Sequence, residues 1–130
     1  MQRLEEEARK FMQDRLIITE VITPDLYEKL ARETAIFPKE KALEYLALGL
    51  TSEAGEVAGK VKKLIRDGED VEGFEMKKIA ISHEIGDVLW YCAMMAKEVG
   101  VPLNTIMREN LEKLHSRKER GTLQGSGDDR

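Results

Sequence analysis

Apolar side chains recur at helical spacing through much of this chain. The clearest stripe lies between about Lys39 or Lys41 and Arg66, where apolar residues return every three or four positions, as on the buried face of a helix. Its members are Leu46, Leu50, Ala54, Val57, Val61 and Leu64. A shorter helix is predicted to begin at Thr23-Pro24-Asp25, with threonine as its cap and proline in its first turn, and to end near Thr34.

Two more helices are predicted after a polar turn at residues 67–70. Residues 74–99 are apolar almost all round, a pattern that usually indicates a buried helix, and Gly100-Val101-Pro102 is typical of its end. The last helix covers about residues 103–119. Few prolines and many Ala, Leu, Glu and Lys residues also favour helices. We therefore predict an all-α fold, an antiparallel bundle of four to five helices.

The two ends of the chain differ from this helical domain, which we assign to residues 23–120. Residues 1–22 are predicted to be an N-terminal extension, with a polar, helix-prone start and a β-branched stretch that suits an extended arm, or an arm packing on another subunit. Residues 121–130 form a glycine-rich tail, which we expect to be mobile when nothing is bound.

The composition excludes several functional classes. The 130 residues suit one domain, and acids outnumber bases 25 to 21 for a net charge of -4, which argues against duplex nucleic acid as a partner. The longest apolar run, residues 88–96, is too short to span a bilayer, and the charged N-terminus has no signal-peptide core. Cys92 is the single cysteine, so an internal disulfide is excluded. This suits a reducing cytoplasm, and we expect Cys92 to be a buried structural thiol.

Four carboxylates fall in two pairs, Glu53 with Glu56 and Glu84 with Asp87. Three-residue spacing puts both members of a pair on one face of a helix. The second pair holds the only acids between Ile79 and Ala96, where a buried carboxylate is costly unless a cation compensates it. A divalent cation is therefore predicted there.

The two pairs are equally distant along the chain from Asp70, in the middle of the polar turn. Two helices joined by that turn should pack antiparallel, so the pairs should lie level and converge. Glycines inside the pairs support this, since a helix-interior glycine costs about 1 kcal/mol against alanine and usually has a packing or functional reason. Gly55 and Gly59 in particular suit a close helix approach. The alternative for the first pair alone is a solvated face, stabilised by Lys60 and Lys63.

All-oxygen ligation fits Mg²⁺, with Mn²⁺ as a possible substitute, and argues against zinc. A di-iron bundle would need Glu-x-x-His pairs, which neither His83 nor His115 supplies. Because Mg²⁺ held by few protein ligands completes its shell with water and substrate phosphates, the substrate is expected to carry phosphate.

The last helix supplies matching cations. Asn110, Lys113 and Arg117 recur at helical spacing, with Arg120 one turn further. Asn110 shares the apolar stripe of that helix and should point inward, which suggests a phosphate or ribose contact. The alternative is that the bases balance the helix dipole and nearby glutamates. Lys60, Lys62 and Lys63 are expected to be solvated, although one could reach a phosphate.

Together these residues resemble the MazG-like, all-α nucleoside triphosphate pyrophosphohydrolases, in particular the short single-domain members of phages and bacteria. The resemblance covers about residues 24–130. It rests on the segments A-R-E-T-A-I-F-P, L-G-L-T-S-E-A-G-E-V, K-K-L-I-R-D-G, H-E-I-G-D-V-L-W-Y, N-L-E-K-L-H-S-R-K-E-R-G and G-S-G-D-D-R.

The resemblance implies Mg²⁺-dependent hydrolysis of a (d)NTP to the monophosphate and pyrophosphate, which would serve nucleotide-pool housekeeping, by a homodimer or homotetramer with sites near subunit interfaces. By position, the four acids would be the metal ligands, and Glu53 or Glu56 would orient or deprotonate the water. Substrate would be bound by Tyr91, Asn110, Lys113, Arg117 and Arg120. Tyr91 fits equally well as plain core. Two alternatives are a relative dedicated to another nucleotide, such as phosphoribosyl-ATP, and a non-catalytic oligomerisation or metal-binding module.

Overall fold

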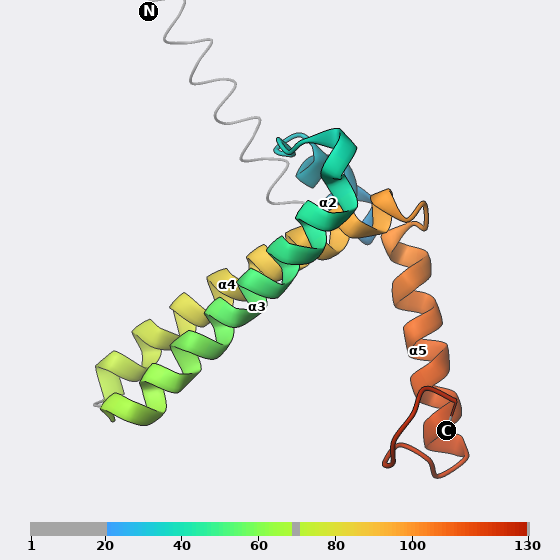
Figure 1. The fold of residues 1–130 in the computed structure, drawn as a ribbon. Helices are drawn as coiled ribbons and strands as arrows, with labels where there is room; N and C mark the ends of the chain where they lie inside the picture. Colours follow the sequence, from blue (N-terminus) through green and yellow to red (C-terminus); the bar gives the residue numbers. More distant parts are fainter. Residues whose placement is uncertain (1–20, 69–70, 130) are drawn as a thin grey trace, which may run out of the picture.

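A computed structural model describes residues 21–68 and 71–129. This part of the chain is all-helical and contains no strand, which confirms the predicted class (Figure 1). The elements are α2 (Pro24–Arg32), the short 3-10 helix η1 (Lys39–Lys41), α3 (Ala42–Asp67), α4 (Val71–Glu98) and α5 (Leu103–Glu119). The predicted bounds agree with these to within a few residues. The predictions for the extension lie outside the described residues, apart from residues 21 and 22.

The predicted helix ends are also confirmed. Thr23 caps α2, its hydroxyl accepting a hydrogen bond of 3.2 Å from the Leu26 amide, which satisfies one of the free N–H groups at a helix start. Gly100 ends α4 with a φ of +73°, a conformation that glycine adopts without strain. The Val101 amide then donates to the Ala96 carbonyl at 3.0 Å, as in a glycine-terminated helix end.

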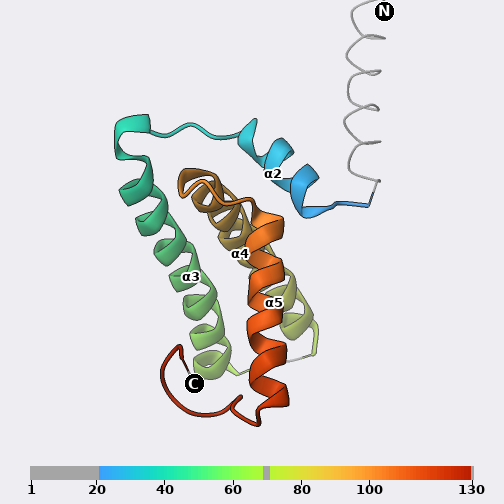
Figure 2. The same cartoon turned by 90° about the vertical axis from the view of Figure 1, so that its right-hand side faces the viewer.

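Helices α3 and α4 form a long antiparallel hairpin and lie side by side along their length in both views (Figures 1 and 2). Gly68, which follows α3, has a φ of +66°, so the reversal falls in the predicted polar turn. Asp70 itself lies outside the described residues.

The core sits at the end of the hairpin away from this turn. Leu46 of α3 packs with Ala93 and Met94 of α4 and with Ala31 of α2, all of them buried. The Trp90 indole N–H fixes α2 against α4, donating to the Thr34 hydroxyl at 2.8 Å. Hydrophobic burial here, together with this hydrogen bond, orients α2 over the hairpin.

The prediction that residues 74–99 are buried throughout is wrong for the first two thirds of α4 in the single chain. Ile79, Ile85 and Leu89 are about half exposed. The physical reason is geometric: in the described residues α3 is the main partner of this part of α4, and one partner helix can cover only one face of another.

Helix α5 leaves the hairpin at a wide angle (Figure 1). Within the described ranges it packs on α2 and α4 but not on α3. Its start is held by Glu28, a buried residue of α2 whose carboxylate accepts a hydrogen bond of 3.1 Å from the Leu103 amide. The predicted antiparallel bundle is therefore realised in the α3–α4 pair, while α5 diverges from it. No helix in the described residues is both long enough and apolar enough to cross a membrane.

Candidate metal centre

Three of the four predicted carboxylates converge midway along the hairpin. One oxygen from each of Glu53, Glu84 and Asp87 lies within 4.8 Å of the other two. Glu84 and Asp87 share a face of α4 because they are three residues apart, and that face is turned towards Glu53 on α3. The prediction that acids from the two helices meet is confirmed for these three residues.

Glu56 is not part of this group; it is exposed on α3. Residues three apart on a helix are offset by about 60° around its axis, so when Glu53 points at α4 its partner turns towards solvent. Glu56 still lies close enough for its charge to act on Glu53. The prediction of four converging ligands is thus corrected to three, with Glu56 beside them.

The cluster concentrates negative charge. The pKa of Glu53 is raised above its ordinary value, first by partial desolvation and then by repulsion from Asp87, Glu84 and Glu56, with a hydrogen bond to Glu84 adding to the effect. Two carboxylates can share a hydrogen bond only when one of them holds a proton. The site thus favours any positive charge that enters it.

One such charge comes from the chain itself. Lys60 of α3 places its Nζ 3.1 Å from Oε1 of Glu84 across the hairpin. Lys60 was expected to be solvated; its side chain is 32% exposed but is paired with Glu84. The spacing in the sequence could have predicted this contact, because Lys60 lies seven residues after Glu53, two helical turns along the same face.

Lysines continue on the turn side of the cluster. A small hollow of about 160 Å³ is lined by Lys60 and Lys63 of α3 and by Lys77 and Ala80 of α4. Positive charge is thus concentrated next to the acids, nearer the turn that joins the two helices.

Aromatic residues lie on the other side of the cluster, towards the core. Tyr91 is half-buried and packs edge-on against Trp90, with ring centroids 5.0 Å apart. Its pKa is raised mainly by desolvation, then by neighbouring Tyr45 and by Glu53. Tyr45 in turn stacks on Phe37, with centroids 5.7 Å apart. Tyr91 thus lies near Glu53 and also packs on the core, which fits both of the interpretations given for it from the sequence.

Tyr27 of α2 lies near Asp87 at the same end of the site. Burial, followed by the charge of Asp87, raises the pKa of its hydroxyl. Cys92 is half-buried, and burial raises the pKa of its thiol, as expected of a structural rather than a nucleophilic cysteine.

The close-approach glycine is Gly49, which sequence reasoning did not single out. A Cβ there would collide with the Tyr91 ring, whereas one at Gly55, Gly59 or Gly86 would meet nothing within 4 Å. The prediction of a groove at Gly55 and Gly59 is therefore wrong. The rotation of α3 about its axis aims Gly49, and not the glycine inside the acid pair, at α4.

The polar residues of α5 are not brought to the carboxylates of their own chain. Asn110 is exposed, which corrects the prediction that it points inward, and Lys113 and Arg120 are exposed as well. The cause is the divergence of α5, which turns this stretch of the helix away from α3.

Arg117 is the exception among the bases of α5, because it is 6% exposed. The tail folds back over it: the Thr122 amide donates to the Arg117 carbonyl at 2.8 Å, and the guanidinium donates to the Asp128 carbonyl at 2.7 Å. In the described residues the tail thus folds back on the end of α5 and covers Arg117.

The carboxylate cluster has the properties that a hard divalent cation requires. Its donors are all oxygens, they come from two rigid helices, and they lie close enough to contact one ion. Their mutual repulsion, seen in the raised pKa of Glu53, is of the kind that a bound cation relieves.

Comparison with known proteins agrees with this geometry. Residues 41–122, which contain Glu53, Glu56, Glu84 and Asp87, match the family model of the MazG nucleotide pyrophosphohydrolase domain. The chain belongs to this family. It is also 45% identical over 112 residues to the Gene 37 protein of Mycobacterium phage L5, an alignment that covers 82% of this chain and 97% of the phage protein. No solved structure matches.

Proposed function

We propose that this protein is a Mg²⁺-dependent hydrolase that cleaves a nucleoside triphosphate, ribose or deoxyribose, between its α and β phosphates. The products are the nucleoside monophosphate and pyrophosphate. The observation that carries the proposal is the convergence of Glu53, Glu84 and Asp87 in a chain of the MazG family. Mn²⁺ would substitute for Mg²⁺, since both prefer carboxylate oxygens.

Glu53, Glu84 and Asp87 would hold the cation, with Glu56 available as a further ligand from the solvent side. When bound, the cation would lower the pKa of a coordinated water and offset the charge of the phosphates. Glu53 or Glu56 would accept the proton of the attacking water. The position of Glu53 inside the cluster and of Glu56 beside it supports this role.

The residues on either side of the cluster suggest how the substrate lies. Aromatic groups, Tyr91 and the neighbouring Tyr45, occupy the core side and suit a base or ribose. The lysine-lined hollow on the turn side suits the β and γ phosphates. The triphosphate would therefore run along the hairpin, with its scissile bond beside the carboxylates and pyrophosphate leaving towards Lys63.

We further propose that the active form is a homodimer or homotetramer. The α3–α4 hairpin and helix α5 both expose apolar side chains, among them Leu89 of α4 and Met107 and Leu111 of α5. Such surfaces usually pack against a partner. A second copy would also bring Asn110, Lys113 and Arg120 of its own α5 within reach of the triphosphate. The site would then be completed only by assembly.

The test is pyrophosphate release from a panel of NTPs, dNTPs and phosphoribosyl-ATP, in Mg²⁺ and in EDTA. We expect release in Mg²⁺ only. Asp87→Asn and Glu84→Gln should reduce turnover by at least about 100-fold, while the matched change Glu112→Gln on α5 should not. Circular dichroism would confirm that the helices persist.

Release from phosphoribosyl-ATP alone would overturn the substrate class. No release from any substrate, with Mg²⁺ binding intact, would leave a non-catalytic metal-binding module as the function. Unchanged turnover in both carboxylate variants would disprove the proposed site itself.

A further inference from the structure

A second cavity lies at the core end of the molecule, away from the carboxylates. Its volume is about 490 Å³, within the range of small-molecule sites. Three elements surround it: α2 with the segment that follows it, the start of α3 with η1, and the C-terminal end of α4. None of Glu53, Glu56, Glu84 and Asp87 lines it.

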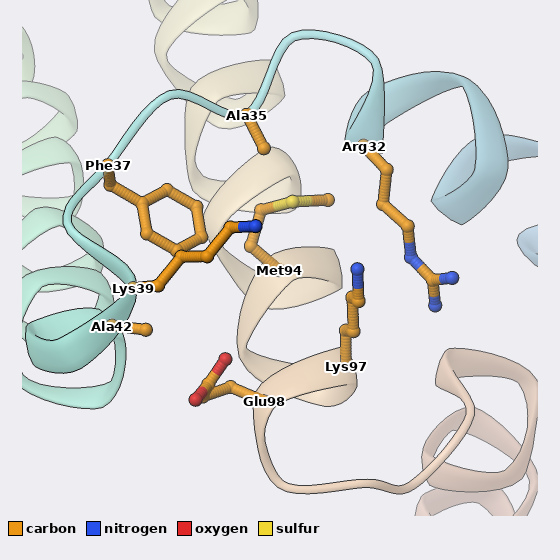
Figure 3. A pocket seen from close by; sticks show the side chains of 8 residues that line it. All are labelled: Arg32, Ala35, Phe37, Lys39, Ala42, Met94, Lys97 and Glu98. Atoms are coloured by element: carbon orange, nitrogen blue, oxygen red, sulfur yellow. The ribbon is translucent and has the colours of Figure 1, made fainter.

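The polar lining of this cavity is cationic. Arg32 comes from α2, Lys39 from η1 and Lys97 from α4, and Figure 3 shows their charged ends facing a common space. Glu98 is the one acid in the lining. Three cations and one carboxylate give the lining a charge of +2, in a protein whose net charge is -4.

These cations are not neutralised elsewhere. Within residues 21–68 and 71–129, ion pairs are formed by other cations, among them Lys60, Arg66, Lys78 and Arg117, and none involves Arg32, Lys39 or Lys97. Like charges that converge without partners repel one another, so an anion that enters the cavity removes an existing unfavourable interaction.

The rest of the lining is apolar: Phe37, Met94, Ala35 and Ala42 form walls around the space that the cations face (Figure 3). Phe37 and Met94 belong to or pack on the buried core, so these walls are fixed. Inorganic phosphate alone would leave them uncovered. A ligand that uses the whole cavity combines an anionic group with an apolar body.

We propose that this cavity binds a phosphate monoester with an apolar or aromatic body, the chemistry of a nucleoside monophosphate, at a site separate from the carboxylate cluster. The phosphate contacts Lys39, Lys97 and Arg32, and the body lies against Phe37 and Met94. Binding needs no divalent cation, since the charges that receive the phosphate belong to the protein.

The experiment is calorimetric titration of the full chain with adenosine monophosphate, thymidine monophosphate and inorganic phosphate, in EDTA and low salt. We expect saturable binding of at least one nucleotide, at least fivefold tighter than that of inorganic phosphate. Affinity should fall several-fold in 300 mM salt, because the three cations are exposed and screened.

Variants assign the binding to the cavity. Lys97→Glu should weaken nucleotide binding at least tenfold, whereas Lys29→Glu, the same charge change on an exposed residue of α2 outside the cavity, should leave it within twofold. Phe37→Leu should weaken the nucleotide but not inorganic phosphate. Asp87→Asn should bind as the wild type does, which separates this site from the proposed active site.

Three results would overturn the proposal: no saturable binding to the wild type, equal loss in the Lys97 and Lys29 variants, or loss of binding in Asp87→Asn. The last would assign the nucleotide to the carboxylate centre instead. Because the titrations contain no divalent cation and measure no turnover, failure here would leave the proposed hydrolase activity untouched.

Discussion

Lys60 and Glu84 form an ion pair across the α3–α4 hairpin, with Nζ 3.1 Å from Oε1. Glu84 belongs to the acidic cluster and Lys60 lines the neighbouring hollow, so this ion pair connects the two sites. In the absence of a cation the ammonium group partly neutralises the acids.

Replacing Lys60 by methionine should therefore change two properties in opposite directions. Mg²⁺ should bind about threefold to tenfold more tightly, because the ammonium no longer competes for Glu84. KM for the nucleoside triphosphate should rise, because a cation beside the phosphates is lost. Calorimetry and steady-state kinetics would check both, with Lys62→Met, on an exposed position of the same helix, as the control. A simultaneous loss of metal affinity would contradict this competition.

Glu53 is crowded by the acids around it. Glu53→Gln should raise the unfolding temperature of the protein in EDTA at pH 7, since it removes like-charge repulsion. The same change should abolish most of the stabilisation that Mg²⁺ gives the wild type, since binding to the native state alone is what shifts the transition. Thermal unfolding with and without Mg²⁺ measures both effects, and a variant that is still stabilised as fully as the wild type would rule Glu53 out as a ligand.

Gly49 allows Tyr91 to pack against α3. Gly49→Ala should destabilise the fold by about 1–3 kcal/mol, as is usual for overpacking, despite the better helix propensity of alanine. Gly59→Ala is the matched control: nothing lies within 4 Å of the added methyl group, so it should stabilise by up to about 1 kcal/mol. Urea unfolding would give both values. A destabilising Gly59→Ala would instead place that face of α3 against another molecule.

The proposed direction of the substrate can be tested with the two products as inhibitors. Lys63→Ala should weaken inhibition by pyrophosphate about threefold to tenfold and leave inhibition by the monophosphate nearly unchanged, because one charge contact to the β and γ phosphates is lost. Tyr45→Ala should do the reverse, because it removes an aromatic contact from the base end. If both variants affected the same product, the proposed polarity along the hairpin would be wrong.

Shared sites can be tested by mixing inactive chains. If the carboxylates of one copy act with α5 of another, then Asp87→Asn and Lys113→Glu should each be inactive alone. Co-refolded in equal amounts, they should recover about a quarter of wild-type activity, because half of the dimers are mixed and each mixed dimer has one intact site. A mixture no more active than its components would argue that each chain supplies its whole site.

The sequence predicted the parts of the site that follow from helix geometry alone. Glu84 and Asp87 had to share a face because they are three residues apart. They had to lie level with Glu53 because the two acid pairs are equally distant from the turn along the chain. Which member of the first pair would face α4 could not be predicted, because that depends on the rotation of α3, which the core contacts of Leu46 determine. The same rotation made Gly49 the contact glycine instead of Gly55.

The direction of α5 could not be predicted from the sequence pattern, for a different reason. The apolar stripe of α5 indicates that one face of the helix packs against something, but it does not indicate which element that face packs against. The direction of the helix is determined by the contact between Glu28 and the Leu103 amide, two groups 75 residues apart in the chain. Asn110 was therefore expected to point inward and is instead exposed.

The carboxylate cluster draws on two consecutive helices, and Glu53 and Glu84 are only 31 positions apart. Closing so short a loop costs little chain entropy, and contacts of low sequence separation generally form early in folding. The carboxylates can therefore assemble in a nascent hairpin before α2 and α5 dock. A divalent cation in the surrounding solution would then act as a template for folding, lending the growing chain stability before its hydrophobic core exists.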